Sequence, residues 1–302
     1  MGEAFPPGWK RRLTGRQEMP AATANCLLTI GETRLILGPS TASFRWAMMN
    51  KHKLLTPLGR GLAAILLWSA AFASALPVVE IGQNFRGSTY GVDSSARPAD
   101  ANGAAGQYHF VEFINGVFSV YTKASGARVQ TMSDDDFWIN AGVVLASGVT
   151  VTDPRIIYDA TVQRWFAATI DYNPSTQINN RFLIAISTSA DPTAAWQALA
   201  FRADPVSGNF ADFPTLGVDA DGVYLAADVF DSADNNLGSL LVSIPKADLL
   251  LPTPTVTNRT SSGLMSFASR GEVLQPVVHL TPGSGGGQVL ASAATIADAG
   301  AN

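Results

Sequence analysis

A recurring unit of about sixty residues constrains the fold of this chain more than any other feature of its sequence. Pro154, Pro214 and Pro276 stand 60 and 62 residues apart, and each begins a short apolar stretch that leads through a turn to a second one. Self-similarity at a fixed period is the sequence signature of a repeat architecture. The sequence therefore predicts several copies of one supersecondary unit.

Each unit opens as a β-hairpin, with a short apolar strand, a turn rich in Gly, Asp or Asn, and a second strand of β-branched and aromatic residues. The proline is expected at the start of the first strand, where its missing N–H disturbs the ladder least. A related hairpin comes earlier, with Asn115-Gly116 between the runs 108–114 and 117–121. Asn-Gly favours a type I′ turn, because both central residues need a positive φ.

After its hairpin each unit adds one or two strands, which we expect at 181–187, 196–201, 240–244 and 255–259. Pro245 opens a stretch that suits one short surface helix. Four strands per repeat predict an all-β fold of β-propeller-like, four-stranded blades. A β-sandwich is the alternative, since many short strands with frequent turns also fit that class. The last unit stops after its second strand, so we expect the propeller to be incomplete at the C-terminus.

Residues 48–75 are typical of a secretory signal peptide, because a basic stretch precedes an apolar run and the small-residue cleavage site Ala73-Ser74-Ala75. A transmembrane anchor is the alternative, but it needs about 20 apolar residues. The residues before it, 1–47, are then an unstructured leader or the product of a start codon upstream of the true one. The remaining parts are an extended N-terminal segment, 76–104, and the truncated propeller-like domain, 105–302.

Cleavage after residue 75 changes the charge of the chain. Nine of the 20 Lys and Arg and three of the 24 Asp and Glu precede that point, which leaves 11 basic and 21 acidic side chains and a net charge of −10. This excludes nucleic acid as a partner, because such binding depends on Lys and Arg contacts to phosphate. The single cysteine, Cys26, is also removed, so no disulfide framework is expected. We expect a secreted or extracellular protein, in the periplasm or at the cell surface in a bacterium, with no stable membrane span after cleavage.

Four segments resemble a group of bacterial secreted β-propeller-like proteins of unassigned function. The segments are Gly106-Gln-Tyr-His-Phe-Val-Glu-Phe-Ile-Asn-Gly116, Asp153-Pro-Arg-Ile-Ile-Tyr-Asp159 with Arg164-Trp165, Ala190-Asp-Pro-Thr-Ala-Ala-Trp196, and Asp212-Phe-Pro-Thr-Leu-Gly-Val-Asp219. The resemblance covers about 100–295. It implies an exported propeller-like domain, and it implies no known reaction.

A propeller directs the innermost strand of each blade along a central channel, so residues at the strand starts approach one rim. On that basis the candidate ligand-binding residues are His109, Asp153, Arg155, Asp212 and Gln275. The alternative is structural: an Asp before a strand caps a turn, and an Arg balances nearby acids. No catalytic residue is assigned.

Zinc chemistry is disfavoured, because the chain after residue 75 has no Cys and only His109 and His279. Calcium accepts carboxylates and carbonyls from loops, and the candidate ligands for it are Asp219, Asp221, Asp231 and Asp234. None of these loops has the twelve-residue EF-hand order, and Asp-rich turns are often simply solvated. We therefore expect no cofactor other than this candidate Ca²⁺.

Two functions remain open at this point. The first is a non-enzymatic propeller that binds an extracellular ligand or glycan through its loop face. The second is a carbohydrate-active hydrolase of the sialidase or glycosidase type, which would use rim carboxylates about 5 to 9.5 Å apart. The Ser-x-Asp-x-Gly-x-x-x-Trp box of sialidase propellers is missing from the sequence. The arrangement of the carboxylates decides between them, since acids dispersed over the surface would exclude the hydrolase.

Overall fold

A computed structural model describes residues 83–281, 283, 285–287 and 289–290. The expected leader, 1–47, the expected signal peptide, 48–75, and the residues from 291 onward lie outside this range. Within it, no helix has both the length and the apolar character needed to cross a bilayer.

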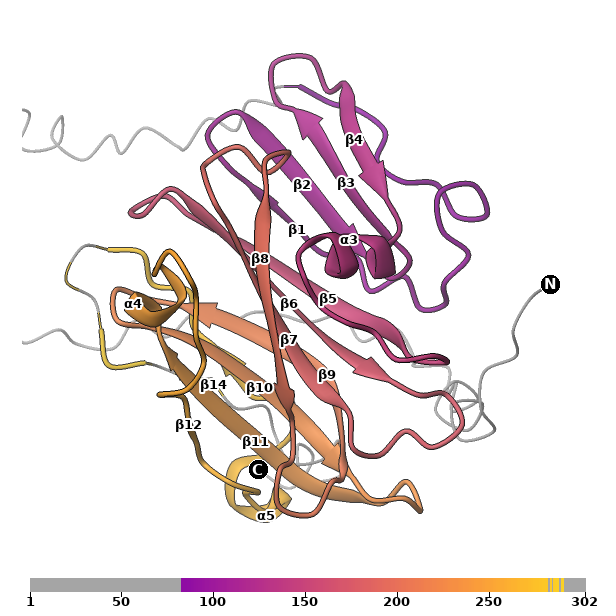
Figure 1. The fold of residues 1–302 in the computed structure, drawn as a ribbon, viewed down its shortest axis with the longest axis vertical. Helices are drawn as coiled ribbons and strands as arrows, with labels where there is room; N and C mark the ends of the chain where they lie inside the picture. The colour runs from indigo at the N-terminus through magenta and orange to yellow at the C-terminus, as the bar shows by residue number, and fades with distance from the viewer. Residues whose placement is uncertain (1–82, 282, 284, 288, 291–302) are drawn as a thin grey trace, which may run out of the picture. The chain divides into compact units, whose positions relative to one another are not determined.

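Three consecutive four-stranded antiparallel sheets make up most of the described part of the chain, coloured from purple through magenta to orange in Figure 1. The first contains β1 (Gly103–Ala105), β2 (His109–Ile114), β3 (Val117–Thr122) and β4 (Arg128–Met132). The second contains β5 (Thr150–Asp159), β6 (Arg164–Tyr172), β7 (Arg181–Ser187) and β8 (Trp196–Arg202). The third contains β9 (Phe210–Val218), β10 (Gly222–Phe230), β11 (Asn236–Pro245) and β12 (Thr260–Ser261).

A fourth, two-stranded sheet follows, and three short helices lie in the connections between strands. The two strands are β13 (Gln275–Pro276) and β14 (Val289–Leu290). The helices are α3 (Asp134–Asn140), α4 (Lys246–Leu249) and α5 (Phe267–Arg270). The short helix expected after Pro245 is therefore confirmed, whereas the outer strand expected at 255–259 is displaced to β12.

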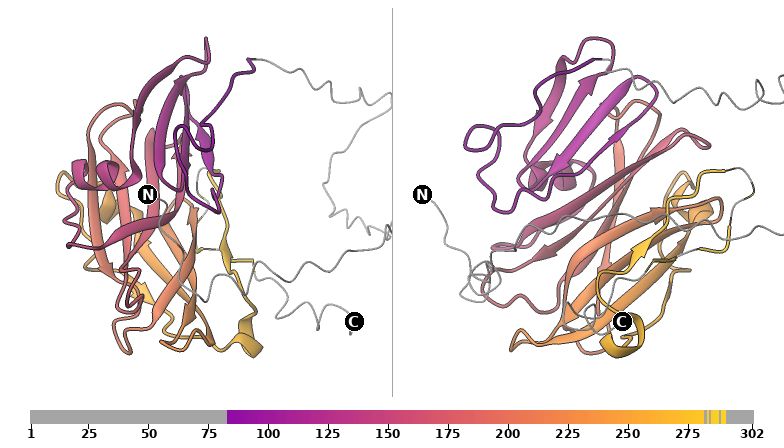
Figure 2. Two further views of the ribbon diagram at one scale, coloured as in Figure 1. Left: turned by 90° about the vertical axis from the view of Figure 1, so that its right-hand side faces the viewer. Right: turned by 180° about the vertical axis from the view of Figure 1, so that it is seen from behind.

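The strand order inside each four-stranded sheet follows the chain, and the first strands of successive sheets contact one another. These contacts join β1 to β5, β5 to β9, and β9 to β13. Figure 2 shows the sheets one after another from two further sides. Meandering sheets whose first strands converge are the blades of a propeller. The predicted all-β, propeller-like fold is confirmed, and a two-sheet sandwich does not fit this connectivity.

The second sheet is buried on both of its faces, because side chains alternate across a strand. On β7, Phe182, Ile184 and Ile186 join a core cluster shared with the third sheet. Leu183 and Ala185 join another cluster shared with the first sheet and α3. Burial on both faces explains why this strand reads as a continuous apolar run in the sequence.

The innermost strands are kinked rather than regular, and the prolines mark the kinks. The register between β5 and β6 skips from Thr152 to Arg155, and the one between β9 and β10 skips Phe213 and Pro214. The prediction that Pro154 and Pro214 start their strands was wrong, because both strands begin four residues earlier. A proline fits a bulge because the bulged residue is unpaired, so its missing N–H costs no ladder bond.

The segment before β1 packs along the first sheet. The Phe85 ring lies 5.0 Å from the Tyr121 ring, and Ser88 donates from both its N–H and its hydroxyl to the Glu112 carboxylate, at 2.9 and 2.7 Å. An Asp93–Arg128 ion pair of 2.6 Å adds a further link. The boundary expected at residue 105 therefore lies inside β1, and the first blade begins earlier.

Candidate functional site

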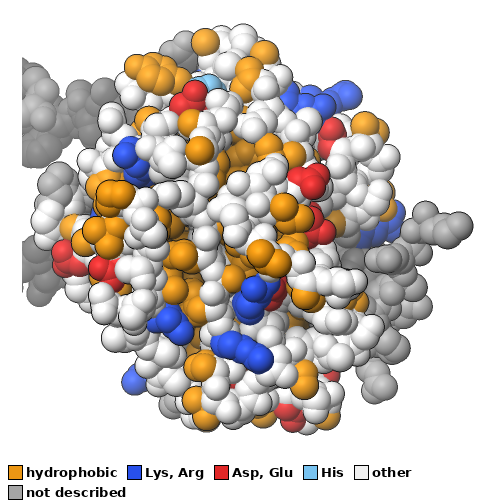
Figure 3. All heavy atoms as spheres, viewed as in Figure 1, with side chains coloured by type: hydrophobic (Ala, Val, Ile, Leu, Met, Phe, Trp, Pro, Cys, Tyr) orange, Lys and Arg blue, Asp and Glu red, His pale blue; other side chains and the backbone are white. Residues whose placement is uncertain are grey.

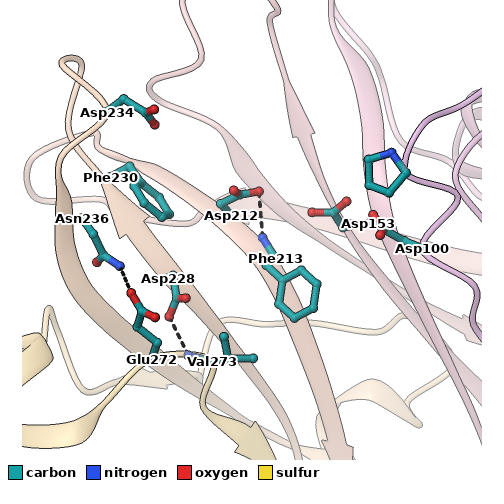
Figure 4. A pocket seen from close by; sticks show the side chains of 11 residues that line it. Asp100, Asp153, Asp212, Phe213, Asp228, Phe230, Asp234, Asn236, Glu272 and Val273 are labelled. Atoms are coloured by element: carbon teal, nitrogen blue, oxygen red, sulfur yellow. Dashed lines mark hydrogen bonds between the residues drawn. The ribbon is translucent and has the colours of Figure 1, made fainter. Parts of the chain in front are cut away.

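A cavity of about 570 Å³ lies where the kinked inner strands meet. Figure 4 shows its lining, in which the Asp153 and Asp212 side chains point toward one another. The lining residues come from the second and third sheets, from the loop after β10, and from the segments before β1 and β13: Pro98, Asp100, Asp153, Asp212, Phe213, Asp228, Phe230, Asp234, Asn236, Glu272 and Val273.

One residue of every repeat enters this cavity from a left-handed backbone conformation. The four residues are Asp100, Asp153, Phe213 and Val273, with φ of 43°, 59°, 52° and 51°. Non-glycine residues rarely adopt this region, and a β-branched residue such as Val273 is strained there. Strain of this kind persists only where the surrounding structure enforces it, and it clusters at binding and active sites. The repeat therefore places the same backbone kink at one point four times.

Polar side chains of the preceding sheet hold two of these kinks in place. The amide oxygen of Asn115, which follows β2, accepts the Asp153 N–H at 2.7 Å. The Asp228 carboxylate on β10 accepts the Val273 N–H at 3.0 Å. Phe213 is held differently, since its N–H donates to the adjacent Asp212 carboxylate at 2.9 Å. The carboxylates of this cavity thus have structural roles as well as facing the open space.

Asp100 and Asp153 form a carboxyl pair on one side of the cavity. Burial raises the pKa of Asp100, and together with hydrogen bonding to the neighbouring Asp153 carboxyl and repulsion from its charge it brings that pKa to about 7. Asn115 donates from Nδ2 to Asp100 Oδ2 at 2.8 Å, and the Thr152 hydroxyl donates to Asp153 Oδ1 at 3.1 Å. Near neutral pH this pair therefore holds a proton that an exposed pair of aspartates would have lost.

Arg155 lies behind the cavity and not in its lining. Its Nε donates to the Pro214 carbonyl at 2.9 Å, and its guanidinium carbon lies 4.8 Å from the centre of the Phe213 ring. Burial lowers the pKa of the guanidinium, while the charges of Asp153 and Asp100 act in the opposite direction. Arg155 therefore supports the Phe213 ring from outside while it lies close enough to both acids to attract them.

The lining is strongly acidic. It contains six carboxyl groups, and among the lining residues that the structure describes there is no Lys, Arg or His. Besides the four acids already named, it contains Asp234 and Glu272, and the Glu272 carboxylate accepts Asn236 Nδ2 at 2.8 Å. The face in Figure 3 differs, because there Lys and Arg side chains are spread among acidic and hydrophobic ones. Low-dielectric walls strengthen the field of like charges gathered in a cavity.

The structure brings together some of the predicted ligand-binding residues and separates others. Asp153 and Asp212 line the cavity, with Arg155 directly behind it. His109 begins β2, at the opposite end of that strand from Asn115, and its Nδ1 lies 3.9 Å from Asp191. Gln275 points to the backbone, donating to the carbonyl oxygens of Leu216 and Pro276. His109 and Gln275 are therefore not part of the cavity lining.

The four predicted calcium ligands are also dispersed. Asp219 accepts the N–H groups of Asp221, Gly222 and Gly287, which helps to lower its pKa against the opposing effect of burial. The Asp231 carboxylate stabilises its own turn in the same way, because it accepts the N–H groups of Ala233 and Asn235. Asp234 lines the acidic cavity. No three or more His, Cys, Asp or Glu side chains in the described ranges are grouped so as to hold a metal ion.

Sequence reasoning missed Asp100, Phe213, Asp228 and Glu272. Asp228 follows Ala226-Ala227 as Thr169 follows Ala167-Ala168, so aligning the repeats could have identified its position. Asp100 precedes Asp153 by 53 residues and not by about 60, and it is not followed by a proline as Asp153 and Phe213 are. Its equivalence to those two residues was therefore not visible in the sequence.

Comparison with known proteins gives structural similarity only. No model of a known protein family matches the sequence, and no curated protein matches it. An exo-β-1,3-galactanase of Clostridium thermocellum is 12% identical with a TM-score of 0.35, over 48% of this chain and 34% of that one. An α-L-arabinanase of Cellvibrio cellulosa is 11% identical with a TM-score of 0.36, over 56% of this chain and 53% of that one. A neuraminidase-like protein of subtype N11 from A/flat-faced bat/Peru/033/2010 is 12% identical with a TM-score of 0.32, over 53% and 36%. The chain thus spans between a third and about half of these proteins, and TM-scores this low transfer no residue role.

Proposed function

We propose that this chain is an exported, β-propeller-like binding protein whose cavity takes a small hydroxyl-bearing ligand without negative charge, such as a sugar unit. The observation that carries the proposal is the cavity itself, at the kinks of four successive repeats. Its volume of about 570 Å³ falls inside the range of about 300–1,000 Å³ that is usual for small-molecule sites.

The chemistry of the lining supports a hydroxyl-bearing ligand. Carboxylates accept hydrogen bonds from hydroxyl groups, and bonds to charged groups are worth about 1.5–3 kcal/mol each. Phe213 is 40% exposed although it is a large apolar side chain, and Phe230 lies on the other side of the same cavity. A ring of this kind covers the apolar face of a ligand while the acids bind its polar edge.

The charge of the cavity argues against an acidic sugar. The carboxyl groups of the lining, most of them ionised, would repel a ligand carboxylate. Among the described residues around the cavity, the Arg155 guanidinium lies behind the lining and donates to backbone carbonyls. A sialidase-type site would instead need arginines directed at the ligand. We therefore propose neutral or basic sugars over acidic ones.

The experiment that tests this function is a glycan array followed by calorimetric titration with the full chain. The variants Asp212→Asn and Phe213→Ala are expected to weaken the binding of any hit at least about tenfold, by removing a charged acceptor and the ring. Asp136→Asn is the matched control, since Asp136 is exposed on α3 away from the lining. Equal loss in the control, or hits confined to acidic glycans, would contradict the proposal.

A hydrolase is the second candidate, and the Asp100–Asp153 pair is the observation that favours it. A carboxyl group with a pKa near 7 can donate a proton at neutral pH, while another carboxylate of the same cavity can act as base or nucleophile. The acids also converge on one cavity, and Asp153, Asp212 and Asp228 are each less than a tenth exposed.

The hydrolase is tested with a panel of nitrophenyl glycosides. Activity should fall above about pH 7, as the general acid loses its proton, and Asp100→Asn or Asp153→Asn should reduce kcat by at least about a hundredfold. Hydrolysis that continues at the wild-type rate in Asp100→Asn would exclude this mechanism.

A further inference from the structure

Two Asn-Gly pairs lie in the first repeat. Asn102-Gly103 leads into β1, and Asn115-Gly116 forms the turn between β2 and β3. Asparagine is among the thermolabile residues of proteins. It is most labile before glycine, which has no Cβ to keep its backbone nitrogen away from the preceding side chain. That nitrogen can attack the carboxamide carbon, so each pair has the chemistry for spontaneous deamidation.

The fold places both asparagines where they join the first sheet to the second. Asn102 Oδ1 accepts the Ile156 N–H at 2.8 Å, and Asn115 Oδ1 accepts the Asp153 N–H at 2.7 Å. One of these N–H groups lies inside the kink of β5 and the other follows it. A change in either carboxamide therefore alters the junction of the first two blades.

The contacts of Asn115 and its glycine oppose deamidation there. The Gly116 N–H donates to the Asp134 carboxylate at 2.7 Å, which holds the attacking nitrogen in place. Asn115 Nδ2 donates to the Pro98 carbonyl at 3.1 Å and to the Asp100 carboxyl at 2.8 Å, and the residue is 6% exposed. Cyclisation at this pair requires these bonds to break first, so it waits for a local opening of the fold.

The pair at Asn102 is held less firmly. The Phe113 N–H donates to the Asn102 carbonyl at 3.0 Å, and bonding alternates along an antiparallel ladder, so the Gly103 N–H points away from β2. Gly103 is exposed, and among the described residues the Asn102 carboxamide is held by one hydrogen bond, from Ile156. A Cβ at position 103 would lie 2.8 Å from the Val111 carbonyl oxygen, so packing itself requires the glycine that makes this pair labile.

We infer that Asn102 is a site of spontaneous deamidation in the folded protein, and that its conversion loosens the first blade from the second. The Gly103 nitrogen bonds to Asn102 Cγ, Nδ2 leaves as ammonia with the proton of that nitrogen, and a cyclic imide forms. Water then opens the imide at either carbonyl, which gives aspartate or isoaspartate. Isoaspartate adds a methylene to the main chain and moves the side-chain oxygen away from the Ile156 N–H. The inference does not depend on the proposed binding function.

Mass spectrometry of the full chain, incubated folded at mildly alkaline pH, tests the inference. Proteolysis after Glu112 puts the two Asn-Gly pairs on different peptides, so Asn115 is a matched control within one sample. Conversion at Asn102 is expected to be at least about tenfold faster than at Asn115, because the second site must first open. In urea the two rates should agree within about twofold, since little beyond the shared local sequence then acts on them.

The rates in the folded protein decide the first part of the inference. Equal conversion at both sites, or conversion of neither while both convert in urea, would overturn it. Because this comparison uses the wild-type protein, it needs no variant to fold.

The variant Asn102→Gln tests the structural consequence. Glutamine keeps the carboxamide but cyclises far more slowly, so the aged variant should keep its midpoint of thermal unfolding. Wild-type protein aged in the same way should unfold at a lower temperature than fresh protein, in proportion to its isoaspartate content. An unchanged midpoint in protein that carries isoaspartate at position 102 would show that the contact with Ile156 does not hold the blades together.

Discussion

Among the carboxyl groups that the structure describes, Asp100 and Asp134 are the two whose pKa burial raises clearly. Burial raises the pKa of Asp134 to about 6, against the opposing effect of the Gly116 N–H, which donates to its carboxylate at 2.7 Å. Asp100 has a pKa of about 7 for the reasons given above. The ordinary pKa of an aspartate is 3.8. In both cases, therefore, the folded protein binds a proton more tightly than the unfolded chain does.

The raised pKa values of these two residues predict how the stability of the protein depends on pH. Their contribution to the free energy of unfolding is fully present below about pH 4. It is lost as the pH rises to about 6 for Asp134 and about 7 for Asp100, because the unfolded state then releases protons that the folded state retains. Between pH 5 and pH 8 the free energy of unfolding should therefore fall, by about 1–3 kcal/mol. Urea unfolding at the two pH values measures it.

The Asp100→Asn variant supplies the control for that measurement. Its stability should change less between pH 5 and pH 8 than that of the wild-type protein. Asp159 and Asp219, whose pKa values are lowered, act in the other direction and lose their contribution as pH falls below their ordinary range. A stability that rises steadily from pH 5 to pH 8 would contradict the raised pKa values.

At the scale of secondary-structure elements, the left-handed residues of the inner strands and of the segments before β1 and β13 carry backbone strain at the cavity. Val273 is the most unfavourable of the four left-handed residues, because its branched side chain crowds the backbone at positive φ. The Val273 N–H donates to Asp228, which holds the kink, and its side chain is 37% exposed, so it contributes little to a core.

Val273→Asn is therefore expected to stabilise the protein by about 1 kcal/mol, since asparagine adopts the left-handed region more easily. The midpoint of thermal unfolding measures the gain. Val278→Asn is the matched control, because Val278 is 46% exposed without a positive φ. An equal gain in both variants would attribute the effect to surface polarity and not to backbone strain.

A buried ion pair links the second blade to the third. Lys246, at the start of α4, lies 2.9 Å from the Asp159 carboxylate at the end of β5, and the two side chains are 5% and 0% exposed. Lys246→Met would leave a buried charge without its partner, which costs about 3–5 kcal/mol.

Chemical denaturation of Lys246→Met measures that cost, with Lys123→Met as a surface control expected to change stability by much less. The double variant Lys246→Met/Asp159→Asn should recover part of the loss, because it removes the uncompensated charge. A double variant less stable than Lys246→Met would mean that Asp159 acts chiefly through its bonds to Thr161.

At the scale of the whole molecule, the second sheet connects the two hydrophobic clusters. Leu183 and Ile184 are neighbours on β7, both fully buried, and they belong to different clusters. In an ordinary amphipathic strand one of two adjacent residues would face solvent. Here each faces a different blade.

Leu183→Ala and Ile184→Ala are therefore each expected to destabilise the protein by about 2–5 kcal/mol, as buried large-to-small substitutions do. Both should lower the midpoint of the same single unfolding transition. Val129→Ala, on the half-exposed edge strand β4, should change stability by less than about 1 kcal/mol. Separate transitions in the two core variants would show that the blades unfold independently.

Much of this architecture could be predicted from the sequence, because hairpins and period are local signals. The runs at 181–187 and 196–201 became β7 and β8 almost as expected, and Asn115-Gly116 forms its hairpin turn. The kinks could not be predicted, since nothing in an Asp-Pro or Phe-Pro pair distinguishes a strand start from a bulge inside a strand. The acidic cavity follows from those kinks, so only two of its six acids were identified as ligand-binding candidates.

The left-handed residues of the inner strands recur at intervals of 53, 60 and 60 positions along the chain. Every interval therefore starts and finishes at a residue with a positive φ that lines the same cavity. Such points are natural joints for modular engineering: a cassette cut from one kink to the next can be exchanged, duplicated or lengthened at its outer loops while the side chains around the cavity keep their positions.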